Sequence, residues 1–213
     1  MVQELKVASS KNLPTVVSPL KMTYEEFLQW ADDKQHVEWV NGEVVFMGTV
    51  SSLHQIIGSF LIALFRIWVE TKNLGEIRYD PFNMKTAPHL NGRSPDILFV
   101  AKENLARLKK NYLEGPADLV VEIISPESRV RDRGEKFYEY EEGGVREYWL
   151  IDPMRKKAEF YCLGEDKTYE AITPDETGVY HSRTLAGLTL KVDWLWQESL
   201  PPILDVVKTW GLI

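Results

Sequence analysis

The stretch that decides the fold is Asp118–Ser125, DLVVEIIS, in which nearly every residue is apolar and several are β-branched. Such a run is typical of a central strand that is buried on both faces of a sheet, and Pro126 predicts its end. Glu122 interrupts the run, and a buried carboxylate costs free energy unless a cation or strong hydrogen-bond donors meet it. A polar residue in conflict with its surroundings often marks function. An edge strand or a structural arginine would also explain Glu122.

The segments around this strand predict a mixed β-sheet with helices on its faces. Before it, Asn41-Gly42 joins two β-rich runs, which is the strongest short-range signal for a hairpin. After it, a helix should follow and stop at Gly143-Gly144. The expected helices cover residues 23–33, 52–73, 103–110 and 131–142, and the expected strands cover residues 37–40, 43–46, 76–85, 96–100, 118–125, 147–151, 157–163 and 168–172.

The length and composition predict one globular domain. The chain has 213 residues, enough for a single domain with a sizeable core. We assign residues 21–213 to that domain, with its core at about 22–161, a β-rich extension at the C-terminus and a flexible arm at 1–20. The longest apolar stretch, Ile56–Val69, is interrupted and shorter than a membrane helix needs. The first residues lack the apolar segment of a signal peptide, so we expect a cytoplasmic protein with no membrane partner.

Charge and cysteine content narrow the function. The net charge of −7 argues against a protein that coats nucleic acid non-specifically, but it does not exclude a nuclease, whose catalytic acids add negative charge. Cys162 is the only cysteine, which excludes an internal disulfide and a cysteine-based zinc site. A small buried apolar residue explains Cys162 better than a reactive thiol does.

Three residues form a candidate site. Asp96 follows Pro95 at the start of the apolar run ILFV; alone it would be read as a strand-start residue, but together with Glu122 on a neighbouring strand it makes a hard oxygen site suited to Mg²⁺. Lys136 lies on the following helix, beside its apolar face, and Asp132 one turn earlier could hold its amine. The alternative for Lys136 is a solvated surface charge.

The motifs together resemble a known family. They are SPDILFV at 94–100, DLVVEIISPESRVRDRGEKFYEY at 118–140 and GVREYWLIDP at 144–153, preceded by MTYEEFLQW, VEWVNGEV and HQIIGSFL. From about Met22 to Tyr161 the chain resembles the Uma-type restriction endonuclease family of bacteria, a branch of the PD-(D/E)XK nuclease superfamily. The linked pattern is specific, whereas each motif alone is weak.

The resemblance implies a restriction-endonuclease-like mixed sheet flanked by helices, with a Mg²⁺-dependent phosphodiesterase site that acts on DNA; Mn²⁺ is a possible substitute, and no small-molecule cofactor is implied. Asp96 would be the acid of the PD element and Glu122 the second acid, and the main-chain carbonyl of Ile123 would add a metal ligand. The chain departs from the superfamily pattern at Ile124, where a lysine is expected. The resemblance therefore makes Lys136, on the next helix, the candidate lysine.

The resemblance also singles out Glu38 and His54. Glu38 would be an extra acid that assists the metal site. His54 would touch a phosphate or a water on the metal, and a helix-start histidine packed against the core is the equal alternative. The basic residues considered for the DNA backbone are Lys109, Lys110, Arg129, Arg131 and Arg133.

Two further questions stay open in the sequence. The main rival to a nuclease is a non-catalytic nucleic-acid-binding or regulatory module that keeps the fold; a hydrolase of another phosphodiester, such as RNA, is a second rival. The apolar C-terminus, which is rich in tryptophan, could either complete the core or form a dimer patch. We expect a homodimer, because enzymes that cut both DNA strands often pair two sites.

Overall fold

The computed structural model describes residues 20–31, 36–125 and 128–213. The arm expected at 1–20 lies outside the described residues except for Leu20, as do Pro126 and the expected end of the first helix at residue 33.

A six-stranded mixed sheet forms the centre of the molecule, in the order β11-β10-β9-β8-β6-β3. Its middle strand is β8 (Leu119–Ile123), buried along its whole length as expected. β8 runs parallel to β9 (Glu147–Asp152) and antiparallel to β6 (Ile97–Ala101). The other strands are β3 (Gly75–Tyr79), β10 (Lys157–Leu163) and β11 (Tyr169–Ile172).

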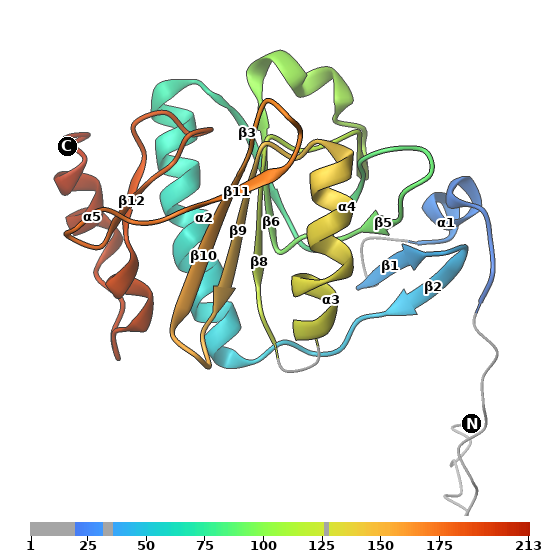
Figure 1. Cartoon of the computed structure of the whole chain (residues 1–213), viewed down its shortest axis with the longest axis horizontal. Coiled ribbons are helices and arrows are strands. Elements are labelled where there is room, and N and C mark those ends of the chain that lie inside the picture. Colours follow the sequence, from blue (N-terminus) through green and yellow to red (C-terminus); the bar gives the residue numbers. More distant parts are fainter. Residues whose placement is uncertain (1–19, 32–35, 126–127) are drawn as a thin grey trace, which may run out of the picture.

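Helices cover both faces of this sheet (Figure 1). Alternate residues of β8 face opposite cores, so that Val121 packs in the core of α2 (Ser52–Lys72) and Val120 packs in that of α4 (Glu135–Gly143). This alternation sends the side chain of Glu122 to the α4 face. The predicted mixed sheet with flanking helices is therefore confirmed.

Helix α2 begins at Ser52, as expected, and its N-cap is Ser51, which accepts a hydrogen bond from the His54 N–H. By length and hydropathy alone α2 could cross a membrane. In the fold its apolar side, including Ile57, Leu61 and Phe65, is buried in the core. A core helix of a soluble protein has these same features.

A second, five-stranded sheet has the order β2-β1-β5-β4-β7. Its β1–β2 hairpin turns at Asn41 and Gly42, both with positive φ, as predicted. The single strand expected over 76–85 is instead divided at Asp80-Pro81 between β3 and β4, which belong to different sheets. Pro81 cannot donate to a ladder, which explains the break. The strands are β1 (Val37–Val40), β2 (Glu43–Phe46), β4 (Asn83–Lys85), β5 (Gly92–Arg93) and β7 (Tyr112–Glu114).

Two expected helices have different forms. The helix predicted over 131–142 is two helices, α3 (Arg129–Arg133) and α4, which meet at Gly134. The helix predicted over 103–110 is a 3₁₀ helix, η1 (Lys102–Arg107). The first helix, α1 (Tyr24–Trp30), begins with a capping box between Thr23 and Glu26.

The C-terminal extension contains helices as well as strands: β12 (Val179–His181), β13 (Thr189–Lys191), η2 (Val192–Trp196) and α5 (Ile203–Thr209). Figure 1 shows α5 on the outer side of α2. The Trp210 ring meets Trp68 of α2 edge to face at 5.2 Å between centroids, and Val206 and Val207 are buried. Of the two roles considered, the apolar C-terminus therefore completes the core.

Candidate active site

The site lies at one end of the six-stranded sheet, where β6 begins and β8 ends. Because these strands are antiparallel neighbours, Asp96 just before β6 lies beside the last residues of β8. Asp96 Oδ2 accepts a 2.6 Å hydrogen bond from the main-chain N–H of Ile123. Asp96, Glu122, Ile123 and Lys136 line one cavity of about 230 Å³. The sequence prediction that these residues come together is confirmed in the geometry.

Lys136 is the cation at the centre of this site, with only 2% of its surface exposed. Its Nζ lies 3.0 Å from Glu122 Oε1, 3.2 Å from Glu38 Oε1 and 3.4 Å from Asp132 Oδ1. The predicted i,i+4 contact with Asp132 is thus present, and Lys136 is not a solvated surface charge. Tyr140, one turn further along α4, donates a 2.7 Å hydrogen bond to the same oxygen of Glu122.

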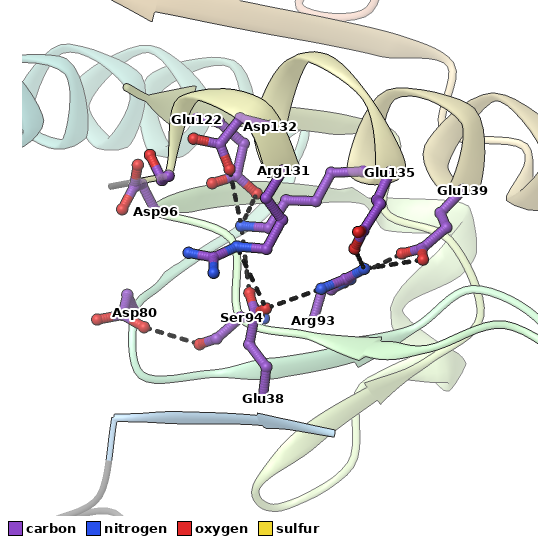
Figure 2. A network of polar contacts seen from close by, with 12 residues as sticks. Glu38, Asp80, Arg93, Ser94, Asp96, Glu122, Arg131, Asp132, Glu135 and Glu139 are labelled. Carbon is purple, nitrogen blue, oxygen red and sulfur yellow. Dashed lines mark hydrogen bonds and ion pairs between the residues drawn. The ribbon is translucent and has the colours of Figure 1, made fainter. Parts of the chain in front are cut away.

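The smaller sheet supplies Glu38 and the buried Arg93 (Figure 2). Arg93 Nη1 lies 3.1 Å from Glu38 Oε2, and its other nitrogens bind Glu135 and Glu139 of α4. Glu38 Oε1 also accepts from the Ser94 N–H at 3.3 Å. Both oxygens of Glu38 are therefore occupied by cations and donors, which favours an ion-pairing role over the expected assistance to a metal.

Charge and burial act in opposite directions on these groups. Burial alone would lower the pKa of Lys136, but Glu122, Glu38 and Asp132 raise it well above its usual value. Burial raises the pKa of Glu122, and the other carboxylates raise it further against the opposing charge of Lys136. The pKa of Glu38 is lowered because Lys136 and Arg93 outweigh its burial. Lys136 therefore stays an ammonium ion among these carboxylates.

Asp132 is a carboxylate with spare hydrogen-bonding capacity. It is buried and lines the cavity, and its Oδ1 forms a 3.4 Å ion pair with Lys136 Nζ but accepts no hydrogen bond from the residues that the structure describes. Burial raises its pKa. The ion pair offsets part of the cost of burying this oxygen, and a hydrogen bond from a water or a substrate would offset more of it. The sequence predicts for Asp132 only a contact with Lys136.

His54 reaches the site from the first turn of α2. Its Nε2 lies 3.1 Å from Asp96 Oδ1, while Nδ1 has no partner within the described part of the chain. Burial would lower the pKa of His54, but the hydrogen bond and charge of Asp96 raise it overall. The imidazole thus positions Asp96, and it also lines the cavity.

The basic residues predicted for DNA separate into two groups. Lys109 and Lys110 follow η1 beyond the far end of β6, so the structure does not bring them to the site. Arg131 lines the cavity. Arg129 and Arg133 lie on the same helix but are paired with Asp152, at 2.9 and 3.7 Å.

The donor set suits a hard divalent cation. Asp96, Glu122 and the carbonyl of Ile123 offer oxygen atoms, and Mg²⁺ commonly takes one or two protein carboxylates and keeps several waters. The cavity is lined by three carboxylates, Asp96, Glu122 and Asp132, and by two side-chain cations, Arg131 and Lys136, so that an added cation would balance its charge. Across residues 20–31, 36–125 and 128–213, no cluster of three or more His, Cys, Asp or Glu side chains is already arranged as a metal cage.

Sequence reasoning did not find Arg93 or Tyr140. Arg93 lies two residues before Pro95 and would have read as a loop charge, because the five-stranded sheet that buries it is built from very short strands. Tyr140 lies four residues after Lys136, and this spacing was the available signal that its hydroxyl reaches the same carboxylate.

The fold and the site together define a restriction-endonuclease-like protein. A structural comparison matches the crystal structure of "a putative nuclease belonging to DUF820" from Anabaena variabilis, with a TM-score of 0.66, 18% identity and coverage of 82% of this chain and 97% of that one. At this identity the match establishes the fold.

The family follows from the sequence. The profile of Uma2, described as "Putative restriction endonuclease", matches residues 24–193, and the chain belongs to this family. A relative from Synechocystis, "Uncharacterized protein slr1290", is 25% identical over 179 residues, which are 83% of this chain and 92% of the relative.

Proposed function

We propose that this chain is a Mg²⁺-dependent endonuclease that hydrolyses DNA phosphodiester bonds, with Mn²⁺ as a possible substitute. The observation that carries the proposal is the meeting of Asp96, Glu122 and a buried Lys136 in one cavity, at 3.0 Å between Lys136 Nζ and Glu122. These residues come from two strands and a helix, in a chain whose family is described as restriction endonucleases.

Asp96, Glu122 and the Ile123 carbonyl would hold the cation, which supplies Lewis-acid stabilisation of phosphate charge when bound. Lys136 stabilises the negative charge that develops on the phosphate. Because its pKa is raised well above the usual value, Lys136 is not the proton acceptor. Asp132, which lines the cavity and whose Oδ1 has only the 3.4 Å ion pair with Lys136, is the group suited to accept the proton of the attacking water.

In this mechanism the water oxygen bonds to phosphorus while the bond to the 3′ oxygen breaks. The water proton passes to Asp132, and the departing 3′ oxygen takes a proton from solvent. The products carry 5′-phosphate and 3′-hydroxyl ends. Arg131, at the edge of the cavity, would contact the backbone phosphate and position the strand without reading sequence.

The test compares DNA cleavage by the parent protein and by Glu122→Gln, each with Mg²⁺ and with a chelator. We expect cleavage only by the parent with Mg²⁺, and 5′-phosphate ends on the products. Equal cleavage by the variant, at equal purity, would overturn the assignment of Glu122.

A non-catalytic binding module is supported by one observation: Lys136 already has three carboxylate partners, so that little of its charge is free. That function predicts DNA binding that is indifferent to Mg²⁺, without cleavage.

The homodimer and the cytoplasmic location expected from the sequence stay predictions. Light scattering of the purified protein tests whether it is a homodimer.

A further inference from the structure

Tyr79 is an exposed aromatic residue directly beside the candidate site. It is the last residue of β3, the edge strand of the six-stranded sheet, and 48% of its surface is exposed. It pairs in register with Ile97, the residue after Asp96, and the next main-chain N–H, of Asp80, donates to Asp96 O at 3.3 Å. The main chain of Tyr79 is therefore held beside the candidate metal ligand Asp96.

Tyr79 and the site share a second cavity of about 200 Å³, which is also lined by Asp96 and His54. Asp80, Gln55 and Ser59 add polar groups, and the remaining walls are apolar or lack a side chain. Those walls are formed by Val50, Gly58 and Ile62. An aromatic ring with an apolar wall and polar groups beside it suits a nucleobase, which stacks through its face and forms hydrogen bonds at its edge.

The charges near the site disfavour a double helix as the main ligand. Tight binding of a duplex depends on several cations that neutralise phosphates. Among the arginines of α3, Arg129 and Arg133 are paired with Asp152, and Arg131 lies 4.0 Å from Glu38. The whole chain carries a net charge of −7. Stacking must therefore supply more of the affinity, and bases are free to stack only where they are unpaired.

We propose that the scissile strand enters this site unpaired, with the nucleotide next to the scissile phosphate stacked on Tyr79, so that the substrate class is single-stranded DNA. This inference rests on the proposed function, because it takes the phosphate to lie at Asp96 and Glu122. Duplex DNA is the alternative outcome of the test.

The experiment measures fluorescence anisotropy of a labelled oligonucleotide, alone or annealed to its complement, at several salt concentrations and without Mg²⁺ so that no cleavage occurs. The parent protein should bind the single strand at least about tenfold more tightly than the duplex. Tyr79→Ala should weaken single-strand binding by about tenfold, the size expected for loss of one stacked base. Tyr79→Phe should keep the affinity, because it keeps the ring.

Tyr138→Ala is the matched control, since Tyr138 is an exposed tyrosine on α4 that lines neither cavity, and its loss should leave binding unchanged. Equal affinity for the single strand and the duplex, or unchanged binding by a folded Tyr79→Ala variant, would overturn the inference. Tyr79-dependent binding without any cleavage would support it while sinking the nuclease proposal. Cleavage of duplex DNA at the same rate by the parent and by Tyr79→Ala would support the nuclease proposal and overturn the inference about Tyr79.

Discussion

Lys136 is a charged residue with almost no solvent exposure, surrounded by Glu38, Glu122 and Asp132. Such a cluster is costly to form, because each ion loses its hydration, and it is still more costly to break from one side. A buried ion cluster in the centre of the fold therefore indicates that the arrangement of charges matters more here than maximal stability. Substitutions at this residue should therefore affect folding as well as chemistry.

Lys136→Met should lower the free energy of unfolding by about 3–5 kcal/mol, because it leaves carboxylates buried without their cation. Urea denaturation measures the effect. Lys110→Met, at an exposed position, should change stability by less than about 0.5 kcal/mol. Adding Glu122→Gln to Lys136→Met should restore part of the loss. A loss below about 1 kcal/mol for Lys136→Met would contradict the ion cluster.

His36 should titrate above its usual pKa of about 6.5. Its Nε2 lies 2.9 Å from Asp80 Oδ1, and the hydrogen bond and charge of Asp80 raise the pKa of His36 although burial opposes them. The stabilisation by this pair is present in full below pH 6.5 and is lost as pH rises through the raised pKa. NMR titration of the imidazole should show the raised pKa, and Asp80→Asn should lower it. An unchanged pKa in that variant would remove Asp80 as the cause.

At the scale of elements, the break between α3 and α4 determines where Asp132 and Lys136 lie. Gly134 ends α3 and starts α4, and a Cβ atom at this position would come within 2.8 Å of the carbonyl oxygen of Val130. The main chain must move to accommodate any larger residue. The glycine thus allows a short helix carrying Asp132 to approach the start of α4.

Gly134→Ala should therefore destabilise the fold by about 1–3 kcal/mol, the range for a forced close contact. It should also weaken Mg²⁺ binding, because α3 carries Asp132 into the cavity. Calorimetry and thermal unfolding test the two effects. Gly48→Ala is the control for stability, since an added methyl group there meets nothing within 4 Å. Unchanged stability of Gly134→Ala would show that the two helices can shift freely.

Most elements of the fold could be predicted from local patterns. The β8 strand, the Asn41-Gly42 hairpin and the helical spacing of α2 each carry a strong signal within a few residues. The division of residues 76–85 between two sheets could not be predicted, because which sheet a strand joins depends on distant partners. The two-residue strand β5 likewise has no pattern of its own, and one of its partners, Trp39, is remote in the sequence.

The site was predictable to the extent that its residues lie in linked motifs. Asp96, Glu122 and Lys136 could be placed together because two neighbouring strands and the helix after them share one end of a sheet. The role of Glu38 could not be predicted, since it depends on Arg93, which is 55 residues away. The distance of Lys109 and Lys110 from the site could not be predicted either. Two adjacent lysines in the sequence do not reveal whether they lie at the end of the sheet that holds the site or at the opposite end.

At the scale of the whole molecule, cation binding and folding should be linked. A cation that binds only the folded chain stabilises it by about 2.7 kcal/mol at a hundredfold excess over Kd. For a chain of this length the melting temperature should rise by roughly 5–10 °C. Differential scanning fluorimetry with Mg²⁺ or Mn²⁺ measures the rise. Asp96→Asn and Glu122→Gln should abolish it, and an equal rise in both variants would place the cation elsewhere.

The ion pairs between Glu38 of the small sheet and Arg93 and Lys136 also constrain how the sequence can change over evolutionary time. Loss of the acid on the hairpin removes one carboxylate partner from each of two buried cations, so a change at position 38 costs least with a compensating change at 93 or 136. Residues almost a hundred positions apart should therefore change together during evolution. A hairpin taken from a distant relative should destabilise the fold unless the residues that pair with its acid are transferred as well.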